Sequence, residues 1–134
     1  MPLPNRPRQS LVVLGSCAAL LLLPGCGKTP KDRIQGKWLG EGIENIPPSQ
    51  MAKATGWVKG TAIEFSGSKV TVTIPAETPR TGTFRIAKAD GDRLTLTFLR
   101  EEGGKDEATF RLADERTLRW IVASGAEIIL TRTQ

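Results

Sequence analysis

The sequence predicts an all-β fold: an antiparallel up-and-down meander of about eight strands that closes into a small barrel, with one short helix near residues 48–55. Three observations lead to this prediction. From residue 61 onward, short runs of alternating apolar and polar residues have the pattern of half-buried strands. Turn residues such as Asp90-Gly91 and Gly103-Gly104 separate these runs, and consecutive strands on short links pair antiparallel. A meander of this many strands protects its edges by closing.

The composition limits the chemistry that the chain can carry. Its 134 residues are enough for one small domain once residues 1–25 are set aside. The absence of histidine excludes Ser-His-Asp triads, Cys-His pairs and His-ligated zinc. Removing Arg6 and Arg8 from the 19 basic groups leaves 17 against 14 acidic groups, a net charge of +3 spread along the chain. No nucleic-acid partner is expected, because proteins that bind nucleic acids carry dense basic patches and this chain has no dense basic run.

A segment with a basic start and an apolar middle precedes the domain. An uncharged stretch from Leu11 to Leu23 follows the two arginines. It is shorter than the ~20 residues that span a bilayer and fits a secretory signal. The stretch ends in Leu23-Pro24-Gly25-Cys26, which resembles a bacterial lipobox, in which the cysteine thiol takes up diacylglycerol. The resemblance implies a signal peptide over residues 1–25 and acyl chains such as palmitate on Cys26, which would anchor the protein to a membrane of the cell envelope.

A second cysteine offers another lipidation site, because Leu14-Gly15-Ser16-Cys17 also resembles a lipobox. Cleavage there would leave only Leu11 to Leu14 as the apolar core of the signal, so Cys26 is the expected site. An uncleaved anchor and a plain secreted protein are the alternatives. Gly27 follows Cys26, and related lipoproteins that stay on the inner membrane carry Asp there. This favours the outer membrane, facing the periplasm.

The first part of the mature chain combines a strand and a short helix. Residues 26–33 are expected to form a lipidated tether and residues 34–134 the barrel domain, whose first strand covers 34–40 around Trp38. Gly40-Glu41-Gly42 predicts a bend in this strand or a close approach of two backbones. Pro47 and Pro48 are expected to open the short helix near residues 48–55, which continues through Gln50 to Ala54 and ends at Gly56.

The remaining strands follow from alternation between turns. The clearest case is Val70, Val72 and Ile74, which alternate with threonines. Seven aromatic residues are spread one per segment, and we expect them to fill the core. Alternatively, some of them line a ligand cavity, because small closed barrels can hold one small ligand. The expected strands are 61–65, 70–74, 84–86, 94–98, 108–112, 118–122 and 127–132.

The first strand also carries a motif. Gly36-Lys37-Trp38 resembles the Gly-x-Trp motif of the lipocalin and calycin group, in which the Trp packs beneath a basic side chain of the last strand. Arg132 lies in the expected last strand, in phase with Ile128 and Leu130. The resemblance, which covers most of residues 33–133, implies a lipocalin-like barrel closed at one end by Trp38 and Arg132. The whole pattern resembles small bacterial lipocalin-like lipoproteins. This resemblance implies that the protein binds a small apolar ligand or a protein partner.

Catalytic and metal-binding patterns are weak throughout. Paired carboxylates such as Asp90 with Asp92 fall at predicted turns, where acidic side chains are solvated, and we expect no metal and no cofactor. Arg85, Arg111 and Arg119 are out of phase with the apolar positions and are expected on the outer face. The expected function is that of a lipid-anchored, non-enzymatic envelope protein that binds a small apolar ligand or an envelope protein. The alternative is a structural or interaction module with a filled barrel and no ligand.

Overall fold

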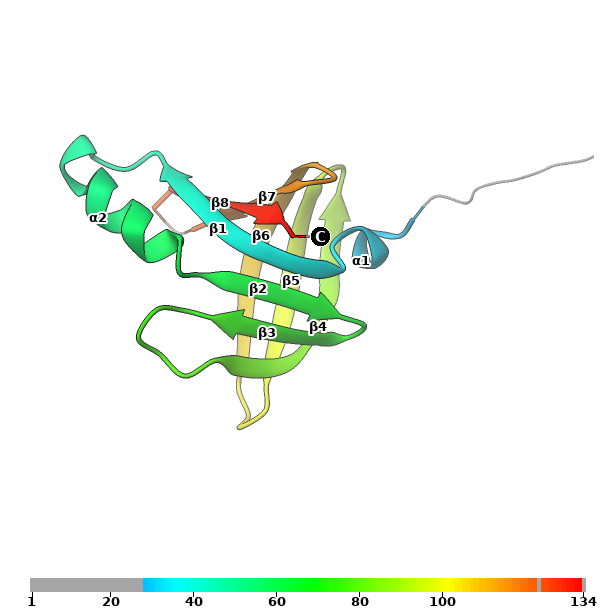
Figure 1. The fold of residues 1–134 in the computed structure, drawn as a ribbon. Coiled ribbons are helices and arrows are strands. Elements are labelled where there is room, and N and C mark those ends of the chain that lie inside the picture. Colours follow the sequence, from blue (N-terminus) through cyan, green and yellow to red (C-terminus); the bar gives the residue numbers. More distant parts are fainter. Residues whose placement is uncertain (1–27, 123, 134) are drawn as a thin grey trace, which may run out of the picture.

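The computed structural model describes residues 28–122 and 124–133. They form a closed barrel in which each of eight strands pairs antiparallel with the next in chain order and β8 pairs back onto β1 (Figure 1). The all-β meander predicted from the sequence is therefore confirmed. The expected signal peptide and Cys26 lie outside the described residues. The elements are α1 (Pro30–Arg33), β1 (Gly36–Glu44), α2 (Pro48–Val58), β2 (Ala62–Ser66), β3 (Lys69–Thr73), β4 (Arg80–Asp90), β5 (Arg93–Arg100), β6 (Lys105–Asp114), β7 (Thr117–Ile121) and β8 (Glu127–Arg132).

The short helix α1 lies within residues 28–33, the described part of the expected tether. Thr29 and Asp32 form a capping box, in which each side chain accepts a hydrogen bond from the backbone N–H of the other residue. Gln35 then exchanges two hydrogen bonds with the backbone of Gly67 in the β2–β3 turn, at 2.7 and 3.0 Å. Nζ of Lys31 in α1 also donates a hydrogen bond to Oγ of Ser68 at 2.6 Å, so α1 lies against the same turn. The first strand starts at Gly36 rather than at Ile34, because Ile34 ends α1 and is buried in the core.

The helix α2 is longer than the sequence predicts, since it passes through Gly56 and ends at Val58. A glycine inside a helix costs up to ~1 kcal/mol. Val58 has no exposed surface, and burying a valine side chain contributes ~1.5 kcal/mol or more. The carbonyl of Val58 also accepts a hydrogen bond from the N–H of Thr61, at 2.9 Å. Packing of the last turn against β1 therefore outweighs the local signal for an end at Gly56.

Both features expected from Gly40 and Gly42 in β1 are present. The pairing of β1 with β8 shifts register between Gly40 and Gly42, which marks a bulge. A Cβ atom on Gly40 would lie 1.9 Å from the carbonyl oxygen of Val58. Glycine at this position lets the end of α2 pack directly on the β1 backbone.

Aromatic side chains form the centre of the core. Phe65 meets Phe84 and Phe110 edge-on, with ring centroids 4.9 and 6.4 Å apart. Trp120 stacks on Phe110 at 5.7 Å, and edge-on and offset pairs of this kind stabilise a core beyond their area burial. The expectation that all the aromatic residues fill the core is wrong at Trp57, which is 42% exposed on α2.

The fold is made within one continuous part of the chain. All eight strands and every buried core residue lie between Ile34 and Arg132. A protein comprising residues 27–134 therefore contains the whole described fold. Within the described ranges, no helix is long and apolar enough to cross a membrane.

Candidate functional site

The barrel has two different ends. One end, which we call the closed end, carries α1 and the β2–β3, β4–β5 and β6–β7 turns (Figure 1). The other, which we call the mouth, carries α2 and the β3–β4, β5–β6 and β7–β8 connections. The contact between Trp38 and Arg132 lies at the closed end and the apolar pocket lies at the mouth, so they are separate sites.

The closed end brings together the two residues that the resemblance indicated. Trp38 of β1 and Arg132 of β8 are directly paired in register. Cζ of Arg132 lies 4.2 Å from the centroid of the Trp38 ring, which is a cation–π contact. Trp38 has no exposed surface, and its indole Nε1–H donates to the carbonyl of Ile34 at 2.9 Å.

Arg132 also connects three segments of the chain by hydrogen bonds. Its Nε donates to the carbonyl of Glu115 at 2.8 Å, its Nη2 to that of Arg33 at 2.6 Å, and its Nη1 to that of Gln35. Partial burial lowers the pKa of Arg132 below its ordinary value; Glu115 opposes this shift and Arg116 adds to it. The N–H donors of the planar guanidinium point in fixed directions, so Arg132 links β8 to the start of β1 and to the β6–β7 turn.

The mouth holds a pocket of about 280 Å³ between β3, β4, β5 and β6. Its walls are mainly apolar and include Val70, Val72, Phe98, Phe110 and Trp120. Aromatic and aliphatic walls with a few polar groups are typical of small-molecule sites, which range upward from ~300 Å³. The expectation that some aromatic residues line a cavity therefore holds for three of them.

The rim of this pocket is charged. Arg80 lies 3.2 Å from a carboxylate oxygen of Glu77. Nε of Arg100 lies 3.0 Å from Oδ2 of Asp106 without hydrogen-bond geometry, whereas Nη2 of Arg100 donates a hydrogen bond to Oδ1 of Asp106 at 3.5 Å. Nη1 of Arg100 lies 3.8 Å from a carboxylate oxygen of Glu102. These side chains are 37 to 69% exposed, so their ion pairs contribute little to stability. Their main effect is on the electrostatic potential at the entrance.

Small residues facing the interior leave this space open. Ala108 lies in β6 between the inward positions of Asp106 and Phe110, and it lines the pocket with Gly82 of β4. A Cβ atom on Gly82 would lie 2.2 Å from the carbonyl oxygen of Leu99, so β5 can approach β4 closely only with glycine there. Sequence reasoning allowed for a cavity lined by aromatic residues, but it did not identify Gly82 and Ala108 as the residues that leave the space open. The sequence signal for this open space is Ala108, a small residue at one of the inward positions of an alternating strand.

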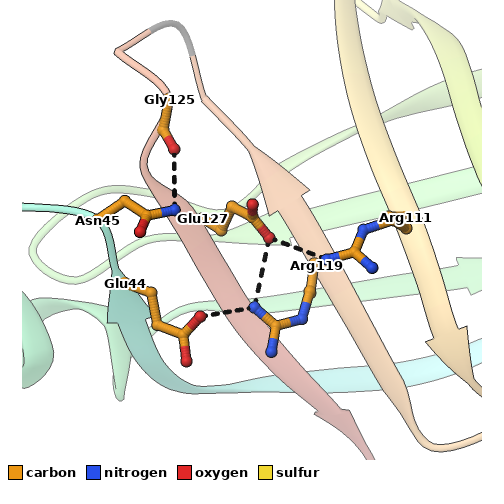
Figure 2. Close-up of polar contacts among 6 residues, drawn as sticks. All are labelled: Glu44, Asn45, Arg111, Arg119, Gly125 and Glu127. Carbon is orange, nitrogen blue, oxygen red and sulfur yellow. Dashed lines mark hydrogen bonds and ion pairs between the residues drawn. The ribbon is translucent and has the colours of Figure 1, made fainter.

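An ion-pair network covers part of the outer face (Figure 2). Arg111 and Arg119 are directly opposite each other on β6 and β7, and Oε1 of Glu127 lies 3.4 and 3.3 Å from their guanidinium nitrogens. Arg119 also contacts Glu44 at 2.8 Å. This hydrogen bond is the main reason that the pKa of Arg119 is raised, although burial lowers it. Arg85 lies apart on β4, so it is not a neighbour of the other two arginines expected on the outer face.

Residues 28–122 and 124–133 contain no group of three His, Cys, Asp or Glu side chains that could hold a metal ion. The paired carboxylates singled out in the sequence lie at the ends of strands and in turns, as expected.

Comparison with known proteins gives one structural similarity. No protein-family model and no curated protein matches the chain. Among solved structures, the chain is similar to a lipocalin-like protein from Bacteroides uniformis, with 17% sequence identity and a TM-score of 0.49. The match covers 75% of this chain and 99% of that one. This chain's own structure has the strand order, the antiparallel pairing and the closure of the lipocalin-like barrel predicted from the sequence. It also has the contact between Trp38 and Arg132 that the resemblance implies.

Proposed function

We propose that this chain is a lipid-anchored, non-enzymatic protein of the cell envelope whose barrel binds one small apolar ligand at its mouth. The observation that carries the proposal is the pocket of about 280 Å³ with aromatic and aliphatic walls. Removing apolar ligand surface from water supplies the driving force, at ~25 cal/mol per Å² buried. The residues at the closed end have a different role, which is to hold the barrel shut.

The ligand-binding part is tested with 1-decanol and a protein comprising residues 27–134. We expect saturable binding by isothermal titration calorimetry. Ala108→Phe places a large side chain in the pocket and should abolish the binding. Ala89→Phe is the matched control, because Ala89 is exposed on β4 and does not line the pocket. Equal binding by the two variants would show that decanol binds elsewhere.

The anchoring part is supported by the lipobox-like Leu23-Pro24-Gly25-Cys26 and the apolar stretch before it. We expect Cys26→Ser in the full chain to move the protein from the membrane fraction to the soluble fraction, or to leave it unprocessed. Cys17→Ser is the matched control and should fractionate like the wild type. Unchanged membrane retention of the Cys26 variant would refute lipidation at this residue.

A second candidate function is that of an interaction module without a ligand. It is favoured by the aromatic cluster around Phe65, Phe84 and Phe110, which fills the interior beyond the pocket. If decanol does not bind, this alternative replaces the first. Cross-linking in the envelope would then identify a protein partner.

A further inference from the structure

We propose that the mouth pocket selects a ligand with a single unbranched chain of about eight to ten carbons that ends in a protonated amine. The inference rests on the proposed ligand-binding function and adds the size and the charge of the ligand to it. Two observations carry it: the volume of the pocket and the balance of charges around its rim.

The volume determines how much chain fits. At ~30 Å³ for each group of the size of a water molecule, a pocket of about 280 Å³ holds on the order of nine such groups. A methylene group is of similar size, so the volume of the pocket corresponds to one chain of this length. Phe110 limits the depth, because it is buried and packs against Phe65 in the core.

The rim carries more negative than positive charge. Five carboxylates and two guanidinium groups line the pocket or the shallow groove that adjoins it at Arg80. The carboxylates are those of Glu77, Glu101, Glu102, Asp106 and Glu107. The rim is thus acidic, although the formal net charge of the whole chain is +5. A local excess of this kind attracts a cation and repels an anion.

The two cations of the rim are already engaged, which disfavours a carboxylate ligand. Arg80 is paired with Glu77 at 3.2 Å, and Arg100 with Asp106 at 3.0 Å. Arg100 also lies against its own turn, where a Cβ atom on Gly104 would be 2.9 Å from Nη2. An anionic head group would have to displace these carboxylates. A protonated amine can instead sit beside them and leave both pairs intact.

The test compares three ligands with the same tail: decylamine, 1-decanol and decanoate, each below the concentration at which it forms micelles. Calorimetry uses residues 27–134 at pH 7 and low salt, where an alkylamine is protonated. We expect decylamine to bind at least about fivefold more tightly than decanoate, with decanol between them. At 0.5 M salt the difference should shrink, because exposed charges are screened.

Variants assign the preference to the rim. Glu101→Gln combined with Glu107→Gln should weaken the binding of decylamine more than that of decanol, and so remove most of the preference for decylamine. Glu64→Gln is the matched control, because Glu64 is an exposed carboxylate on β2 that lines neither the pocket nor the groove. It should leave all three affinities as they are.

The outcomes separate this inference from the proposed function. If decanoate binds as tightly as decylamine or more tightly, the inference is overturned while ligand binding stands. The same holds if the preference survives in the double variant. If none of the three binds, both the proposed function and the inference fail.

Discussion

Truncation of Arg132 should open the closed end of the barrel and cost far more stability than the loss of an ordinary surface arginine. The side chain joins three carbonyl groups that belong to Arg33, Gln35 and Glu115, and it covers the Trp38 ring. Arg132→Ala removes all four contacts together. Arg132→Lys keeps the charge, but a single ammonium group cannot serve carbonyls in three directions.

The magnitude follows from these contacts. A cation–π contact with a desolvated ring contributes ~1–2 kcal/mol, and hydrogen bonds to charged groups contribute ~1.5 kcal/mol or more each in buried settings. Because Arg132 is only partly buried, we expect Arg132→Ala to lower the free energy of unfolding by ~2–3 kcal/mol. We expect Arg132→Lys to recover less than half of this loss. Trp38→Ala should cost more, ~3–5 kcal/mol, because the side chain has no exposed surface.

Urea unfolding of residues 27–134 measures these differences, with Arg85→Ala as the control. Arg85 is an exposed arginine in β4, and its truncation should change stability by less than ~0.5 kcal/mol. The reasoning is refuted if Arg132→Ala unfolds at the same urea concentration as Arg85→Ala. It is also refuted if Arg132→Lys is as stable as the wild type, since the fork geometry would then be irrelevant.

Two further substitutions test contacts elsewhere in the barrel. Gly40→Ala should destabilise the fold by ~2–3 kcal/mol, because its Cβ would lie 1.9 Å from the carbonyl oxygen of Val58. The Cβ of Gly42→Ala would meet no atom within 4 Å, so this variant should be neutral or slightly stabilising in the same urea unfolding experiment. Glu127→Gln removes the carboxylate between two arginines that face each other across strands and should cost ~1 kcal/mol at low salt. Glu64→Gln should cost nothing, and equal losses for the two Glu variants would show that the network does not stabilise the barrel.

Local patterns in the sequence were enough to predict the strands and their order. Alternation of apolar and polar residues is a property of neighbours within one strand, and turns such as Asp90-Gly91 depend on a few adjacent residues. Short connections then force antiparallel pairing in chain order. The contact between Trp38 and Arg132 was foreseen through the resemblance, which links the first strand to the last.

Features that depend on several distant segments could not be predicted in this way. The end of α2 was misplaced because Gly56 is a local signal, whereas burial of Val58 against β1 is a tertiary one. The pocket arises where Gly82 and Ala108, on different strands, face the same space. Likewise, the acidic rim exists only because the β3–β4 and β5–β6 connections meet at one end of the barrel. Closure of the sheet brings these side chains together, and no periodicity along the chain encodes which of them become neighbours.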